Sequence, residues 1–339
     1  MSRPPRVVAL GGGHGLAASL AALRRLTRHV TAVVTVADDG GSSGRLRREL
    51  GALPPGDLRM ALAALAGDDE WGHTWADVLQ HRFGGTGALA GHPVGNIVLT
   101  GLAETLGDPV AALDTVARLV GAVGRVLPMS PQPLEISAEV AGLDDADPDR
   151  VRRIRGQVAV ATTIGRVVSV SLVPADPPAC ADAVRAVAEA DLVVLGPGSW
   201  FTSVLPHVLV PDLLAALVAT PARRVVALNL AAQPGETAGF SPQQYLEVLA
   251  AHAPGLRVDA VVADTDAVSD ARGLMSGVSA LGARLVLAPV AAGDGTPRHD
   301  PKRLATAYQQ VLEELPVVVE QTAGLAHDGG RKAGVRQWP

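Results

Sequence analysis

Residues 7–20 have the sequence VVALGGGHGLAASL, in which an apolar run meets four glycines within five residues and an Ala/Leu-rich segment follows. The apolar run predicts a strand over 6–10, and the segment after the glycines predicts a helix over 16–27. Glycines let the backbone approach a ligand closely, and a helix N-terminus presents free N–H groups. The stretch therefore predicts a strand–loop–helix unit that binds phosphate through Gly12, Gly13, His14 and Gly15.

The composition favours an α/β protein. Of the 339 residues, 48% are hydrophobic but only 3% are aromatic, so we expect a core of Ala, Val and Leu. Val-rich runs alternate with Ala/Leu-rich helical patterns, as in α/β folds. We predict one domain over 1–320, with a Rossmann-like, mostly parallel sheet and helices on both faces. A small antiparallel β insertion is expected at about 134–173, and a flexible tail at 321–339.

Several classes of protein are disfavoured. The net charge is −5 and no basic cluster is interleaved with aromatics, which argues against nucleic-acid binding. The single cysteine, Cys180, excludes an intramolecular disulfide and a cysteine-based zinc site. The longest apolar region, 204–219, is interrupted by prolines and charge and makes a poor membrane span. No signal peptide precedes the first strand, so a cytoplasmic location is expected.

The same periodicities predict the remaining elements. Residues 134–140, 156–162 and 166–172 look β-like and are separated by Asp/Pro-rich turns, which suggests the antiparallel insertion. Further strands are expected at 30–36, 192–195, 225–230, 258–262 and 284–289, and helices at 58–65, 95–122, 181–190, 213–219, 241–252 and 301–315.

A second motif, DDGGSSGR at 38–45, follows the second predicted strand. Residues 13–18 fit the loose dinucleotide pattern G-x-G-x-x-A, and Asp38 lies roughly 20 residues on, where a ribose-binding acid is expected. The second acid, Asp39, together with Ser42, Ser43 and Arg45, is more typical of a nucleotide, metal–phosphate or sugar-hydroxyl site. Asp38 and Asp39 can hold Mg²⁺ that bridges phosphates, and Arg45 can pair with a phosphate.

A second glycine loop, LGPGSWFTS at 195–203, also follows a predicted strand. Two such loops on one sheet predict two phosphates, or two ends of one ligand. Its candidate ligand-binding residues are Gly198, Ser199, Thr202 and Ser203. Four more residues are candidates for ligand binding. Asp57 and Asn96 are either helix caps or ligand contacts. If Asp57 contacts the ligand, Arg59 lies with it at the mouth of the site, and Asn229 is a candidate because it stands at the end of a predicted strand.

Taken in order, these motifs resemble one family over about residues 6–305. The motifs are GGGHGL at 11–16, VADDGGSSGR at 36–45, GDLR at 56–59, GN at 95–96, LPMS at 127–130, GPGS at 196–199, TS at 202–203 and QPGET at 233–237. They resemble the gluconeogenesis factor family (YvcK- or GlmR-like), a sister of the CofD-like 2-phospho-L-lactate transferases.

The resemblance implies a cytoplasmic bacterial protein that binds UDP-sugars, notably UDP-N-acetylglucosamine. It also implies support of cell-wall precursor supply and cell shape on gluconeogenic carbon sources. Arg298, in the RHD sequence at 298–300, matches the family arginine that contacts the UDP-sugar. A family tyrosine that also contacts the sugar has no clear match here. From the residues alone, 298–300 is equally well a charged start to the last helix.

Three functions stay open. The first is a UDP-sugar-binding regulator that needs no cofactor. The second is a Mg²⁺-dependent phospholactyl or nucleotidyl transferase, with Asp38 and Asp39 as candidate catalytic and metal-binding residues. The third is an NAD(P)-dependent oxidoreductase. An enzyme of cell-wall precursor synthesis and a second copy of the chain are open expectations as partners, whereas nucleic acid and a membrane span are not expected.

Overall fold

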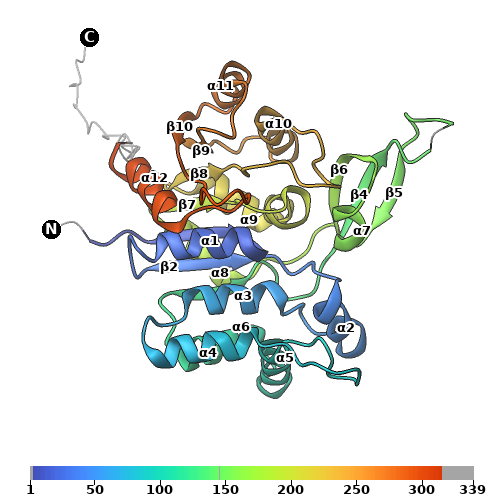
Figure 1. Ribbon diagram of the computed structural model, residues 1–339, viewed down its shortest axis with the longest axis vertical. Helices are drawn as coiled ribbons and strands as arrows, with labels where there is room; N and C mark the ends of the chain where they lie inside the picture. Colours follow the sequence, from blue (N-terminus) through green and yellow to red (C-terminus); the bar gives the residue numbers. More distant parts are fainter. Residues whose placement is uncertain (1–2, 145, 315–339) are drawn as a thin grey trace, which may run out of the picture.

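The computed structural model describes residues 3–144 and 146–314, and it contains a seven-stranded parallel sheet (Figure 1). The order of the strands is β10-β9-β8-β7-β1-β2-β3. The structure confirms the predicted Rossmann-like α/β fold. The strands are β1 (Val7–Gly11), β2 (Val30–Val34), β3 (Arg125–Pro128), β7 (Leu192–Leu195), β8 (Arg223–Ala227), β9 (Ala260–Asp264) and β10 (Arg284–Ala288).

Strand β1 lies inside the sheet and is buried along its whole length. Val7 pairs in parallel register with Val30 of β2 on one side and with Leu192 of β7 on the other. After β1 the chain continues to β2, toward the β3 edge of the sheet. After β7 it continues to β8, toward the β10 edge. Because parallel crossovers are right-handed, these opposite directions place α1 (Gly13–Leu23) and α9 (Pro211–Ala219) on opposite faces.

The other helices complete the two layers. Helix α1 packs against α3 and α12, and α8 packs against α9. Two short turns, η1 (Trp200–Val204) and η2 (Leu205–Leu209), follow β7. The remaining helices are α2 (Gly41–Leu50), α3 (Gly56–Leu65), α4 (Glu70–Gln80), α5 (Val94–Leu106), α6 (Pro109–Leu119), α7 (Gln157–Ala161), α8 (Ala181–Ala188), α10 (Pro242–His252), α11 (Ala271–Ala280) and α12 (Pro301–Glu314).

The predicted insertion is a three-stranded antiparallel sheet beside the main one (Figure 1). Its strands are β4 (Glu135–Ala141), β5 (Arg152–Arg155) and β6 (Arg166–Val173). The prediction of a strand at 156–162 is wrong, because these residues contain the short helix α7. The observed strand, β5, ends just before them, at Arg155. Strand β5 has the sequence RRIR and lies at the edge of this sheet. Because three of its four residues are arginines, it does not show the alternation of apolar and polar residues that predicts a strand.

Two further differences have local causes. The helical pattern at 95–122 is two helices, because Gly107 takes a left-handed conformation (φ 67°) and Asp108 caps the next helix before Pro109. The region expected as a loop after Asp39 becomes helix α2 from Gly41 onward. The end of the predicted last helix, at 315, and the tail at 321–339 lie outside the described residues.

No single helix within the described ranges is long and apolar enough to cross a membrane. The apolar region near 204–219 bends by 79° between the η turns and α9. Its large side chains, such as Leu205 and Leu213, are fully buried in the core.

Candidate functional site

The two glycine loops touch each other at the carboxyl ends of β1 and β7. A Cβ atom on Gly15 would lie 2.2 Å from the carbonyl oxygen of Pro197 and 2.7 Å from the Cα of Gly198. Both neighbours are backbone, so only glycine allows this approach. Ligands of parallel α/β sheets bind at this edge. We call the two loops and the strand ends around them the glycine-loop edge.

The side chain of Asn229, just beyond β8, holds the second glycine loop. Its Oδ1 accepts the Gly198 N–H at 2.9 Å, and its Nδ2 donates to the Gly198 oxygen at 2.8 Å. From the other side, the Ser19 hydroxyl on α1 donates to the Gly196 oxygen at 3.0 Å. Asn229 therefore positions the loop through both the oxygen and the nitrogen of its side-chain amide.

Asp57 reaches from the first turn of α3 to the start of α1. A Cβ on Gly12 would lie 2.3 Å from its Oδ2 atom. Burial, with help from the charge of Asp38, raises the pKa of Asp57 to about 7, although the Gly13 N–H and Arg59 oppose the rise. Pro55 is the residue at the N-cap of α3, and no side chain caps that helix. Asp57 thus faces the first glycine loop instead of capping its own helix.

Asp38 lies beside Asp57. Its Oδ1 accepts the Gly40 N–H at 2.9 Å, and its Oδ2 would lie 3.1 Å from a Cβ on Gly56. The Ser43 hydroxyl accepts the Gly56 N–H at 3.1 Å, which joins the second motif to the start of α3. The structure therefore brings Asp38, Ser43 and Asp57 together next to the first loop.

Asp39 points instead toward the insertion. Its Oδ1 accepts the Val158 N–H of α7 at 3.0 Å, and a Cβ on Gly156 would lie 2.1 Å from its Oδ2. The adjacent acids of the second motif therefore separate, one facing the glycine-loop edge and one holding the antiparallel sheet.

Three other predicted residues make contacts within the protein. The buried Ser42 hydroxyl lies 2.7 Å from His92 Nδ1 and accepts a hydrogen bond from Asn96 Nδ2 at 3.0 Å. Burial lowers the pKa of His92. Asn96 lies inside α5, which has Pro93 at its N-cap, so it does not cap that helix. Arg45 donates to the Ala90 oxygen at 2.8 Å. These contacts join α2 to the segment before α5.

The second loop continues into η1, where Ser199 is the residue before the turn and Thr202 and Ser203 are buried within it. Sequence reasoning missed Glu236, which is 2% exposed and faces this turn. Burial raises its pKa to about 7, and neither carboxylate oxygen has a hydrogen-bond partner among the described residues. The polar run at 233–237 after Asn229 was the signal that could have found it.

Arg298 lies in the loop between β10 and α12, with its side chain 72% exposed. It forms an ion pair with Asp294 at 2.5 Å. Its neighbour His299 contacts the Leu228 oxygen at 3.2 Å, next to Asn229. The loop thus adjoins the glycine-loop edge, while the guanidinium of Arg298 is engaged within its own loop.

A metal ion would need carboxylates at this edge. In the described part of the chain, no group of three or more His, Cys, Asp or Glu side chains is placed to hold one. Mg²⁺ commonly takes only one or two carboxylates and completes its shell with phosphates and water. The neighbouring carboxylates of Asp38 and Asp57 fit that requirement, whereas that of Asp39 is occupied by the insertion.

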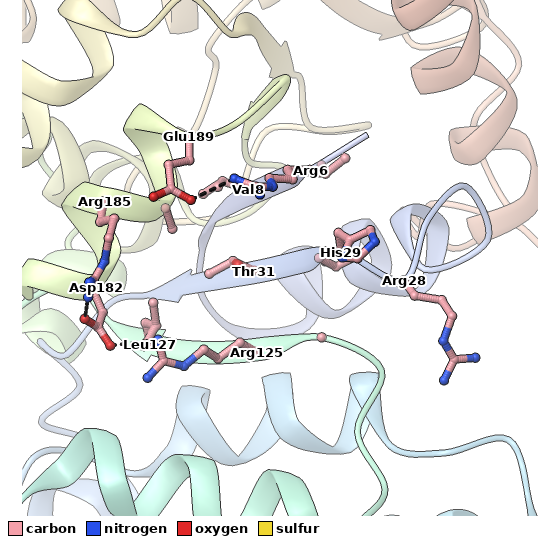
Figure 2. A pocket seen from close by; sticks show the side chains of 14 residues that line it. Arg6, Val8, Arg28, His29, Thr31, Arg125, Leu127, Asp182, Arg185 and Glu189 are labelled. Atoms are coloured by element: carbon pink, nitrogen blue, oxygen red, sulfur yellow. Dashed lines mark hydrogen bonds and ion pairs between the residues drawn. The ribbon is translucent and has the colours of Figure 1, made fainter. Parts of the chain in front are cut away.

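A separate hollow of about 340 Å³ lies at the opposite edge of the sheet, at the starts of β1, β2 and β3 (Figure 2). Its charged side chains are largely paired. Arg6 lies 2.8 Å from Glu189, and Arg125 lies 2.7 Å from Asp182, which also contacts Arg185. No predicted site residue lines this hollow.

The chain is similar to known proteins over most of its length. The model of the family described as 2-phospho-L-lactate transferase CofD matches residues 7–276. A protein of Mycobacterium tuberculosis, provisionally named a gluconeogenesis factor, is 59% identical over 98% of each chain. The gluconeogenesis factor of Listeria monocytogenes is 34% identical over 91% of this chain and 96% of its own.

The fold has solved counterparts as well. The crystal structure of a UPF0052 family protein from Bacillus halodurans superposes with a TM-score of 0.81 at 30% identity, covering 92% of this chain and all of the other. Sequence and structure agree over nearly the whole chain. The chain therefore belongs to the gluconeogenesis factor family, which the CofD family model also covers.

Proposed function

We propose that the glycine-loop edge binds a UDP-sugar, notably UDP-N-acetylglucosamine, and that the chain acts as a nucleotide-sugar-responsive regulator. The contact between Gly15 and Pro197 is the observation that carries the proposal. It places the N–H groups at the start of α1 next to the backbone and hydroxyls of the second loop. A diphosphate needs several such donors close together.

Other residues support the same ligand. His14 is exposed at the start of α1 and is free to approach a phosphate. Arg298 would complete the site if it exchanged Asp294 for the ligand. The relatives named as gluconeogenesis factors support a role in gluconeogenic growth, and we extend the proposal to cell-wall precursor supply and cell shape. No cofactor is needed for binding alone.

A Mg²⁺-dependent transfer of a phosphorus-containing group is the second candidate. The pairing of Asp38 with Asp57 and the match to the CofD family favour it. The two carboxylates would hold the ion, which would neutralise developing phosphate charge when bound.

Calorimetric titration of the full chain with UDP-N-acetylglucosamine tests the first proposal. We expect binding, and we expect Asn229→Ala to weaken it at least about tenfold, because two hydrogen bonds that hold the second loop are lost. Gln309→Ala is the control, since this exposed side chain contacts only its own helix. A folded protein that gives no heat at millimolar ligand would refute the proposal.

Turnover separates the two candidates. If a UDP- or GDP-linked substrate is consumed with Mg²⁺, and both Asp38→Asn and Asp57→Asn abolish the reaction, the chain is a transferase. Binding without turnover supports the regulator.

A further inference from the structure

Arg59 is a buried arginine without a partner. It is 4% exposed, its Nε is fully buried, and among the described residues its guanidinium makes no hydrogen bond or ion pair. An arginine keeps its charge at all ordinary pH values, and a buried charge is costly unless it is paired. The free protein therefore holds a charge that an anion from outside would neutralise.

The position of this guanidinium is fixed by packing. The stem of Arg59 passes Gly95 of α5 so closely that a Cβ there would lie 2.8 Å from Arg59 Cγ and 3.0 Å from Cδ. Glycine at 95 gives the stem its path. A charged group held by its stem loses little further entropy when it binds a ligand.

Arg59 lines a cavity of about 500 Å³ between α1, α3 and α4. Alanines form much of its wall, and its polar groups are His14, Arg59, Asp77, Gln80 and Arg82. Its volume lies within the range of small-molecule sites. Of the residues of the two glycine loops, only His14 lines this wall, so the cavity adjoins the glycine-loop edge at that one residue.

The balance of charge in the cavity is positive. Arg59 and Arg82 line it against a single carboxylate, that of Asp77. Arg82 donates to the Gly91 oxygen at 2.9 Å.

We propose that this cavity is a second ligand site, in which Arg59 and Arg82 bind the phosphate or carboxylate group of a small molecule. Planar guanidinium groups match such oxyanions with two parallel hydrogen bonds. His14, at the start of α1, faces the same space. The site goes beyond the proposed UDP-sugar function and does not depend on it.

Titration of the full chain with inorganic phosphate and, separately, with malonate tests the site and tells the two oxyanions apart. We expect one of them to bind, and we expect Arg59→Gln and Arg82→Gln each to weaken binding at least about tenfold. Arg118→Gln on α6, whose exposed side chain contacts its own helix, should leave it unchanged. If neither anion binds, or if both variants bind normally, the proposal is wrong.

Thermal unfolding gives an independent readout. Without anion, Arg59→Gln should raise the melting temperature by about 2 °C or more, because it removes an unpaired buried charge. A purely structural arginine would lower it. The anion-dependent rise in melting temperature should vanish in this variant. If Arg59→Gln does not fold, the titration of Arg82→Gln decides.

The titration is then repeated with saturating UDP-N-acetylglucosamine. Retained anion binding supports a separate site, and displacement places the anion at the glycine-loop edge and overturns the proposal. If the UDP-sugar itself gives no heat, the proposed function fails while the anion titration still decides the second site.

Discussion

Two acidic side chains with raised pKa values flank the glycine loops. Asp57 lies against the start of α1, Glu236 faces the start of η1, and burial raises the pKa of each to about 7. When ionised, either carboxylate would compete with a ligand phosphate for N–H groups. When protonated, it would not. The proton occupancy of these residues therefore bears on both stability and anion binding.

Replacement of Asp57 by Asn should change how stability depends on pH. Between pH 4 and 7 the unfolded carboxyl is ionised while the folded one keeps its proton, so the free energy of unfolding falls as pH rises. We expect Asp57→Asn to reduce the loss of stability between pH 5 and pH 8 by roughly 1–3 kcal/mol. Urea unfolding at both pH values measures this. Asp149→Asn, in an exposed loop, is the control, and an unchanged loss in Asp57→Asn would contradict the assignment.

At the scale of elements, the contact between the glycine loops should not tolerate a methyl group. Gly15→Ala would place Cβ 2.2 Å from the Pro197 oxygen, so the loops must part. We expect a loss of roughly 1–3 kcal/mol in stability, as for overpacking in a core, and weaker UDP-sugar binding. The matched control is Gly101→Ala at an exposed position of α5, where a Cβ meets open space and the variant should gain roughly 0.5–1 kcal/mol. Equal unfolding midpoints for the two variants would show that the loops can yield.

The insertion should loosen when Asp39 is replaced. Asp39→Ala removes the acceptor of the Val158 N–H, which joins α7 to the main sheet. We expect faster hydrogen exchange across 152–161, measured by mass spectrometry. Asp144→Ala, which breaks ion pairs at the far end of the same insertion, should affect only the hairpin around 144–152. Unchanged exchange at Val158 in Asp39→Ala would show that other contacts hold α7.

Sequence patterns predicted most of the parallel sheet, because its strands are continuous apolar runs that end at glycine or acidic motifs. They missed β3 and the helices α4 and α11. They also missed β5, whose arginines give no apolar signal, and the helix α2, which begins among glycines and serines. They also found both glycine loops. They could not show that Asp39 turns away or that Asp57 joins Asp38, because both facts depend on contacts between segments distant in the chain.

At the scale of the molecule, the last described helix is tied to the first. The Tyr308 hydroxyl of α12 lies 2.8 Å from Ser19 Oγ, and Ser19 donates to the Gly196 oxygen. Tyr308 must therefore donate to Ser19, and burial raises the pKa of its phenol. Through the buried Ser19 hydroxyl, helix α1 near the start of the described chain and helix α12 near its end are both joined to the second glycine loop.

Loss of the Tyr308 hydroxyl should cost about 1 kcal/mol, as for a typical buried hydrogen bond. Urea unfolding of Tyr308→Phe, Ser19→Ala and the double variant gives the coupling between the two side chains. We expect roughly 0.5–1.5 kcal/mol of coupling. Strictly additive effects would mean that the contact contributes nothing.

The central place of β1 has a consequence for synthesis of the chain. Strand β1 emerges early from the ribosome and pairs with β2, which begins at Val30, yet its other partner, β7, begins only at Leu192. Until then one side of β1 presents unpaired backbone groups, which invite pairing with other chains. A nascent chain released before β7 would carry its first glycine loop without the second. Premature termination would therefore yield an aggregation-prone fragment that lacks half of the proposed ligand site.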